Sequence, residues 1–265
     1  MDERVRQLFV VGALALFGLA GVFFFRLPPA TLLWPWPDTP LSFIFLASIL
    51  AAIAAPLLWI GISGEFAASR AGALNLFVTF GGWCVYFILL HAQRGEAQLL
   101  VWAIVCAAFT LANVAVWFWA RTIPLHDRRQ TPRPVRASFV VFALVLIPVG
   151  TALLMRQPHV FPWPLNPDSS VLFGLIFLGA AVYFIHAVAW PSWANAKGQL
   201  AGFLAYDLVL IWPYLRHFGT VKVEHRASLI VYVAIIVFSG ALAVYYLLID
   251  RQTRGRLAGG IARTP

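Results

Sequence analysis

Long runs of apolar residues are the strongest constraint on how this chain can fold. Eight of them occur, at residues 7–25, 41–62, 73–92, 98–120, 138–155, 171–193, 200–218 and 228–249. Each is close to the ~20 residues that an α-helix needs to cross the hydrocarbon core of a bilayer. Only 11% of the 265 residues are charged, whereas charged residues make up about 25% of a soluble domain. We therefore predict an all-α integral membrane protein with eight transmembrane helices.

Two other interpretations of these runs are less favourable. A transmembrane β-barrel would show apolar and polar residues in alternation, and the runs lack that pattern. The first run follows Arg4 and Arg6, as the apolar part of a secretory signal peptide does. We interpret it as a retained span, because its removal would leave the first half of the chain one helix short of the second.

A proline- and tryptophan-rich element occurs twice. It is LLWPWPDTP at residues 32–40 and VFPWPLNPD at residues 160–168. The shared residues, 127 positions apart, are Pro35, Trp36 and Pro37 in the first copy and Pro162, Trp163 and Pro164 in the second. Such repetition is typical of membrane proteins built from two related halves. Because each half has an even number of spans, we expect both halves to share one orientation.

The chain is accordingly divided into four parts. Residues 1–120 are predicted to form the first four-helix repeat, and residues 138–250 the second. Residues 121–137 are a basic cytoplasmic linker between them, and residues 251–265 are a basic cytoplasmic tail. The arginine-rich linker is expected to lie against anionic lipid headgroups. Its short length does not favour nucleic acid as a partner.

The distribution of positive charge predicts the orientation. If both termini are cytoplasmic, 13 of the 19 Lys and Arg residues fall on the cytoplasmic side and 6 on the external side. Cytoplasmic segments carry the excess of Lys and Arg in membrane proteins. We therefore expect a multi-pass protein of the cell inner membrane, with both termini in the cytoplasm.

This orientation places both proline–tryptophan elements on the external face. Prolines there would turn the chain into the next helix, and tryptophan is favoured at the level of the lipid headgroups. We interpret the elements as interfacial anchors that set how the next helix enters the membrane. The alternative is that they form external lips around a substrate entrance or a surface that docks a membrane-protein partner.

Two ionisable residues at membrane depth are the candidate functional residues. His186 and Asp207 lie at similar distances from the short turn between the sixth and seventh runs. Charged groups in lipid are costly and often functional, and a His–Asp contact would satisfy both. Tyr183 and Tyr206 flank this level and could extend a network. The alternative is that the pair only clamps two neighbouring helices.

No other chemistry is indicated. The sequence has no glycine-rich phosphate loop, no HExxH zinc motif and no nucleophile elbow. Cys84 and Cys106 lie inside apolar runs and are interpreted as packing residues. We therefore expect no catalytic residue, no cofactor and no metal site, and the sequence offers no positive evidence for an enzyme.

Two functions are compatible with these features. The first is a small transporter or channel for a proton or for a lipid-like or apolar solute, because many carriers are duplicated and the interior has few polar groups. The second is a non-catalytic accessory or scaffold subunit of a larger membrane complex. A cavity that reaches His186 and Asp207 would favour the first, and a solid core with a broad apolar flank would favour the second.

Overall fold

The structure is a computed structural model that describes residues 3–253. Its helical elements are α1 (Glu3–Phe24), α2 (Pro28–Leu33), α3 (Pro40–Ser63), the 3-10 turn η1 (Phe66–Ala68), α4 (Ser69–Arg94), α5 (Ala97–Arg121), α6 (Arg133–Leu154), α7 (Pro167–Ala189), α8 (Trp193–His217), α9 (Val223–Val244) and the π-helical segment η2 (Tyr245–Ile249). The described residues form no β-strand, so the predicted all-α class is confirmed. The predicted basic tail lies outside the described residues from position 254 onward.

Seven helices in the described part of the chain are long and apolar enough to cross a membrane. They are α1, α3, α4 with η1, α5, α6, α7 and α9 with η2. The chain is therefore a multi-pass membrane protein. The remaining predicted span, residues 200–218, corresponds to α8, which has 25 residues but carries Lys197, Gln199 and Asp207 among its apolar residues. Its length suits a span, and its composition is less apolar than that of the other seven.

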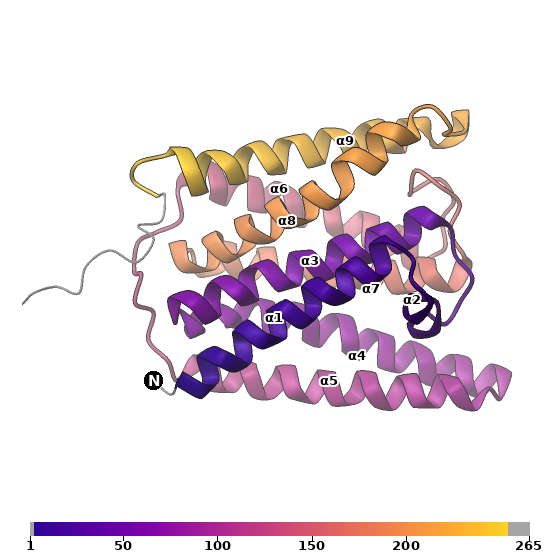
Figure 1. Ribbon diagram of the computed structural model, residues 1–265, viewed down its shortest axis with the longest axis horizontal. Helices are drawn as coiled ribbons and strands as arrows, with labels where there is room; N and C mark the ends of the chain where they lie inside the picture. Colours follow the sequence, from indigo (N-terminus) through magenta and orange to yellow (C-terminus); the bar gives the residue numbers. More distant parts are fainter. Residues whose placement is uncertain (1–2, 254–265) are drawn as a thin grey trace, which may run out of the picture.

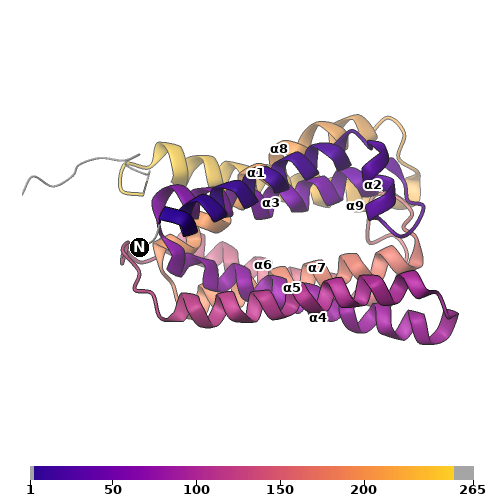
Figure 2. The ribbon, with the colours of Figure 1, turned by 60° about the horizontal axis from the view of Figure 1, so that its bottom comes forward.

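The long helices lie in two layers. One layer contains α1, α3, α8 and α9 in that order, and the other contains α5, α4, α7 and α6 (Figures 1 and 2). Each layer thus combines two helices from the N-terminal part of the chain with two from the C-terminal part. In particular, α3 packs against α8, and α4 packs against α7.

Glycines allow the backbones to approach closely where these helices cross. A Cβ atom on Gly179 of α7 would lie 2.7 Å from the backbone oxygen of Asn75 in α4. A Cβ atom on Gly202 of α8 would lie 2.9 Å from the backbone oxygen of Ala52 in α3. Real Cβ atoms essentially never come so close to another heavy atom. Such close van der Waals packing is a main source of cohesion between helices in lipid.

Both proline–tryptophan elements lie at one end of the molecule, here called the tryptophan end. The N-terminus lies at the opposite end, here called the linker end (Figure 1). The chain turns alike before each element, because Arg26 and Arg156 both have a positive φ, of 52° and 56°. Each following helix begins with a proline, Pro40 in α3 and Pro167 in α7. Proline suits this position, where the missing N–H would have no helical partner.

The tryptophan of the second element is buried, which differs from its interpretation as an interfacial anchor. Trp163 is 3% exposed, and its Nε1 donates a hydrogen bond to Oγ of Ser42 at 2.9 Å. Ser169, near the start of α7, donates to the carboxylate of Asp38. This burial is possible because the indole N–H finds a buried hydroxyl partner. The two elements therefore join the N-terminal and C-terminal parts of the chain.

The first element is packed in a similar way. Trp34 is buried, and its Nε1 donates to Oδ2 of Asp38 at 2.8 Å. Trp36 is half-buried and stacks on Phe87, with 6.0 Å between the ring centroids. Pro37 and its counterpart Pro164 are exposed at the tryptophan end.

The linker is attached to the protein at the linker end. Glu65 is buried, and its Oε1 accepts hydrogen bonds from the backbone N–H groups of His126 at 2.7 Å and Asp127 at 3.0 Å. The backbone N–H of Trp193 donates to the carbonyl of Arg129 at 2.7 Å. Hydrogen bonds from Arg129 hold the pKa of the Asp127 carboxyl below its usual value. These hydrogen bonds hold the linker against the linker end of the protein. The helix α6 begins at Arg133, five residues before the predicted span.

We predict that Gly179→Ala lowers the free energy of unfolding by about 1–3 kcal/mol, because the added methyl group overpacks the α4–α7 crossing. Thermal unfolding in detergent, followed by circular dichroism, measures the effect. Gly72→Ala in α4 is the control, because a Cβ atom there meets nothing within 4 Å. It should change stability by less than about 1 kcal/mol. Equal melting temperatures for the two variants would contradict the close approach of α4 and α7.

Candidate functional site

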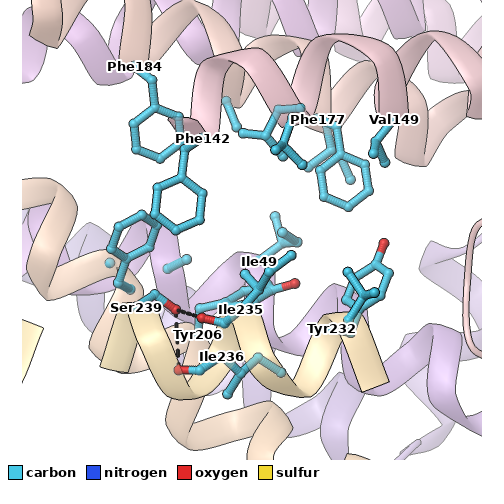
Figure 3. Close-up of a pocket in the computed structure, with 18 of the residues that line it drawn as sticks. Ile49, Phe142, Val149, Phe177, Phe184, Tyr206, Tyr232, Ile235, Ile236 and Ser239 are labelled. Atoms are coloured by element: carbon cyan, nitrogen blue, oxygen red, sulfur yellow. Dashed lines mark hydrogen bonds between the residues drawn. The ribbon is translucent and has the colours of Figure 1, made fainter. Parts of the chain in front are cut away.

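An apolar cavity of about 390 Å³ lies between the two layers. Its walls come from α6 and α7 on one side and from α3, α8 and α9 on the other (Figure 3). The lining is almost entirely aliphatic and aromatic, and its polar members are Gln199, Tyr206, Ser228, Tyr232 and Ser239. The cavity lies largely within the C-terminal part of the chain, to which α3 adds Ile49 and Ala52.

Three phenylalanines close the cavity toward the linker end. Phe142 of α6 stacks on Phe184 of α7 with 5.3 Å between the ring centroids, and it approaches Phe203 of α8 at 4.8 Å. The helices α6 and α7 belong to one layer and α8 to the other, so this cluster of three rings spans both layers. Val160 and Ser228 line the other end of the cavity, near the second proline–tryptophan element.

The cavity opens sideways between α6 and α9. Val145 of α6 and Val231 of α9 both line it, and they are 39% and 56% exposed. Exposed lining residues on both helices are consistent with a cavity that reaches the protein surface between them. Because α6 and α9 are long and apolar enough to cross a membrane, we infer that this opening faces the lipid.

One polar group of the lining is both buried and without a partner. Among the residues that the structure describes, the buried hydroxyl of Tyr232 accepts and donates no hydrogen bond. Figure 3 shows this hydroxyl directed across the cavity toward Phe177 and Val149. An unpaired hydroxyl in an apolar environment costs free energy unless a bound molecule satisfies it. The described part of the protein therefore leaves the hydrogen-bonding capacity of the Tyr232 hydroxyl unused.

Asp207 lies just behind the cavity wall. It is buried, and its carboxyl group is 2.9 and 3.0 Å from Oγ of Ser239 in α9. The Ser239 hydroxyl also approaches the backbone oxygen of Ile235 at 2.8 Å. A hydroxyl has a single proton to donate, so it cannot serve both acceptors at once. Ser239 thus links the buried carboxyl group to the surface of the cavity.

The predicted contact between His186 and Asp207 is not formed. Within the described residues no hydrogen bond joins them: His186 lies against Trp190, with 4.8 Å between the ring centroids, and its Nδ1 has no partner. The two residues do lie on consecutive helices, but α7 and α8 belong to different layers. His186 instead lines a separate pocket at the linker end, together with Arg70 and Arg121.

The two flanking tyrosines also have separate roles. Tyr206 lines the cavity, whereas the hydroxyl of Tyr183 donates to the backbone oxygen of Asn195 at 2.9 Å. The sequence did not identify Tyr232 as a site residue. No local signal marks it, because an aromatic residue in an apolar helix is more often a packing residue, and only the neighbouring helices reveal that its hydroxyl faces a cavity.

Comparisons with protein-family models, with curated proteins and with solved structures found no match for this chain. The geometry of the cavity is therefore the basis on which a function is assigned.

We predict that Ser239→Ala lowers the free energy of unfolding by about 1–3 kcal/mol, because it leaves the buried carboxyl group of Asp207 without a partner. The double variant Ser239→Ala with Asp207→Leu is the control, because it removes both polar groups. It should regain part of the lost stability. Melting temperatures in detergent measure both effects. If Ser239→Ala melts at the same temperature as the wild type, the contact between Ser239 and Asp207 does not stabilise the fold.

Proposed function

We propose that this protein is a small transporter that binds a lipid-like or apolar solute in the cavity between its layers. The observation that carries the proposal is the cavity itself, which is apolar, opens toward lipid and includes the buried, unpaired hydroxyl of Tyr232 in its lining. Its volume of about 390 Å³ falls within the ~300–1,000 Å³ typical of ligand sites. A molecule that leaves the bilayer for this cavity loses no hydration shell, so its entry carries little desolvation cost.

The chemistry of the lining favours this solute over an ion or a sugar. A hydrated solute needs many polar groups to replace its water, and the lining offers only Gln199, two serines and two tyrosines. A mostly apolar molecule with one or a few acceptor oxygens matches this set. Its acceptor would lie beside Tyr232, and its apolar part would lie along the phenylalanines.

We also propose that α8 crosses the membrane, which gives eight spans, and that the chain consists of two four-helix repeats. Three features support this. Arg26 and Arg156 adopt the same left-handed conformation, and each is followed by a proline–tryptophan element and a proline-initiated helix. The contacts between helices are also paired: α1–α3 corresponds to α6–α7, α4–α5 to α8–α9, and α3–α8 to α7–α4. This is the pattern expected for a pseudo-two-fold axis along the membrane normal.

A second candidate function is that of an accessory subunit of a membrane complex. It is favoured by a shallow groove of about 630 Å³ over α1, α3 and α8, where small residues such as Gly21, Ala47 and Ala51 leave room for another helix. Small residues are enriched where membrane helices pack. In this alternative the cavity would hold a structural lipid, and a partner protein would copurify in a fixed ratio.

We predict that the linker end is cytoplasmic, because the excess of Lys and Arg lies there. In a chain whose native cysteines are replaced by alanine, Glu96→Cys marks the tryptophan end and Arg128→Cys marks the linker end, and both positions are exposed. A membrane-impermeant thiol reagent applied to intact cells should label only Glu96→Cys. Labelling of Arg128→Cys alone would reverse the orientation.

We predict that the protein, purified in mild detergent, retains about one apolar molecule per chain, which mass spectrometry of an organic extract can identify. Ala180→Phe should abolish retention, because Ala180 lines the cavity and the larger side chain fills it. Tyr232→Phe should weaken binding by about 2- to 10-fold, which corresponds to the loss of one hydrogen bond of about 0.5–1.5 kcal/mol.

The matched control is Ala112→Phe, which places the same side chain on the exposed face of α5. It should bind as the wild type does. If Ala180→Phe folds and retains the same molecule at the same ratio, the ligand does not occupy this cavity. A partner protein that copurifies with the wild type and not with a groove variant such as Ala51→Phe would support the accessory function.

A further inference from the structure

Three side chains that could bind a metal ion converge at the tryptophan end. They are His159, immediately before the second proline–tryptophan element, and Glu224 and His225, in the first turn of α9. One ligand atom of each residue lies within 4.8 Å of those of the other two. These residues also line a pocket of about 270 Å³, so a small ion would have space beside them.

His225 is already oriented as metal ligands are. It is buried, and its Nδ1 is 2.8 Å from the backbone oxygen of Phe161. A carbonyl oxygen can only accept, so Nδ1 must carry the hydrogen. The other ring nitrogen, Nε2, is 3.9 Å from the carboxylate of Glu224, and in the neutral ring it keeps a free lone pair. A histidine that binds a metal typically donates its second N–H to a carbonyl or a carboxylate in this way.

His159 is held beside His225 by the backbone. Its φ of 65° is in the left-handed region, which few residues other than glycine adopt. The hydroxyl of Ser228 donates to the carbonyl of His159 and so ties this turn to α9. The two imidazole rings are 4.9 Å apart between centroids. This turn thus brings a second histidine ring next to His225.

The donor set indicates the type of ion. Two imidazoles and one carboxylate favour zinc and similar first-row divalent ions over calcium or magnesium, which prefer oxygen ligands. Tetrahedral zinc with ligands at about 2.0–2.1 Å would bring the donor atoms to about 3.3 Å from one another. His159 and Glu224 are exposed, so rotation of their side chains can close this distance while His225 stays fixed.

We propose that His159, Glu224 and His225 form a binding site for a zinc-type divalent metal ion, with one coordination position left for water or another ligand. The site lies next to the lipid-like solute cavity, because Val160 and Ser228 line the cavity and Ser228 bonds to His159. It is independent of the proposed transport function, since metal binding requires no solute.

The test is zinc titration of the full-length protein, purified in detergent without a polyhistidine tag and stripped with a chelator. We expect one zinc ion per chain. Glu224→Gln and His159→Ala should each weaken binding at least about tenfold, because the loss of an outer-shell partner alone weakens metal affinity by about 10–100-fold. Both residues are exposed, so these variants should fold, and His225→Asn should weaken binding as well.

His91→Ala is the matched control. His91 lies near the same end of the molecule, in the last turn of α4, and its Nδ1 contacts the backbone oxygen of Glu96 at 2.9 Å. This variant should bind zinc as the wild type does. The proposal is overturned if the wild type binds no zinc, or if the Glu224 and His159 variants bind with unchanged affinity and stoichiometry. Retention of an apolar molecule by these variants would be unaffected in either case.

Discussion

Close packing between helix backbones is the interaction on which this structure depends. Lipid offers no hydrophobic gain for helix association, so cohesion requires that atoms approach closely. Gly179 against Asn75 and Gly202 against Ala52 supply this approach at the crossings that join the two parts of the chain. Contact is therefore tightest within each layer, and the space between α6, α7, α8 and α9 is left to side chains, which do not fill it completely.

The cavity follows from this arrangement. Because α7 and α8 lie in different layers, the space between the layers has α6 and α7 on one side and α3, α8 and α9 on the other. Phenylalanines from α6, α7 and α8 fill the space toward the linker end. Beyond them the side chains leave the cavity open, and it reaches the lipid between α6 and α9. The buried hydroxyl of Tyr232 has no partner among the described residues in this apolar space, and it therefore bears more directly on function than the charged residues do.

The polar groups of the protein are concentrated at its two ends. At the tryptophan end, Asp168 accepts hydrogen bonds from Tyr86 at 2.7 Å and from Arg94 at 2.7 Å. At the linker end, Glu65 holds the backbone of the linker. Both carboxylates are buried and fully engaged, so they fix the ends of the bundle. The cluster of His159, Glu224 and His225 differs from them, because two of its three members are exposed and its donor atoms are not saturated by the protein.

The sequence by itself determined the helical class, the multi-pass character and the approximate positions of the long helices, because lipid requires long apolar segments with internal backbone hydrogen bonding. It also indicated that Trp36 and Trp163 belong to equivalent elements, which lie at one end of the molecule. It placed His186 and Asp207 at similar depth, but depth along a helix does not specify the face of the helix or the neighbouring helix. Only the tertiary structure decided that α7 and α8 separate into different layers, that Asp207 meets Ser239, and that Tyr232 faces a cavity. Those contacts depend on packing between segments far apart in the sequence, which no local pattern encodes.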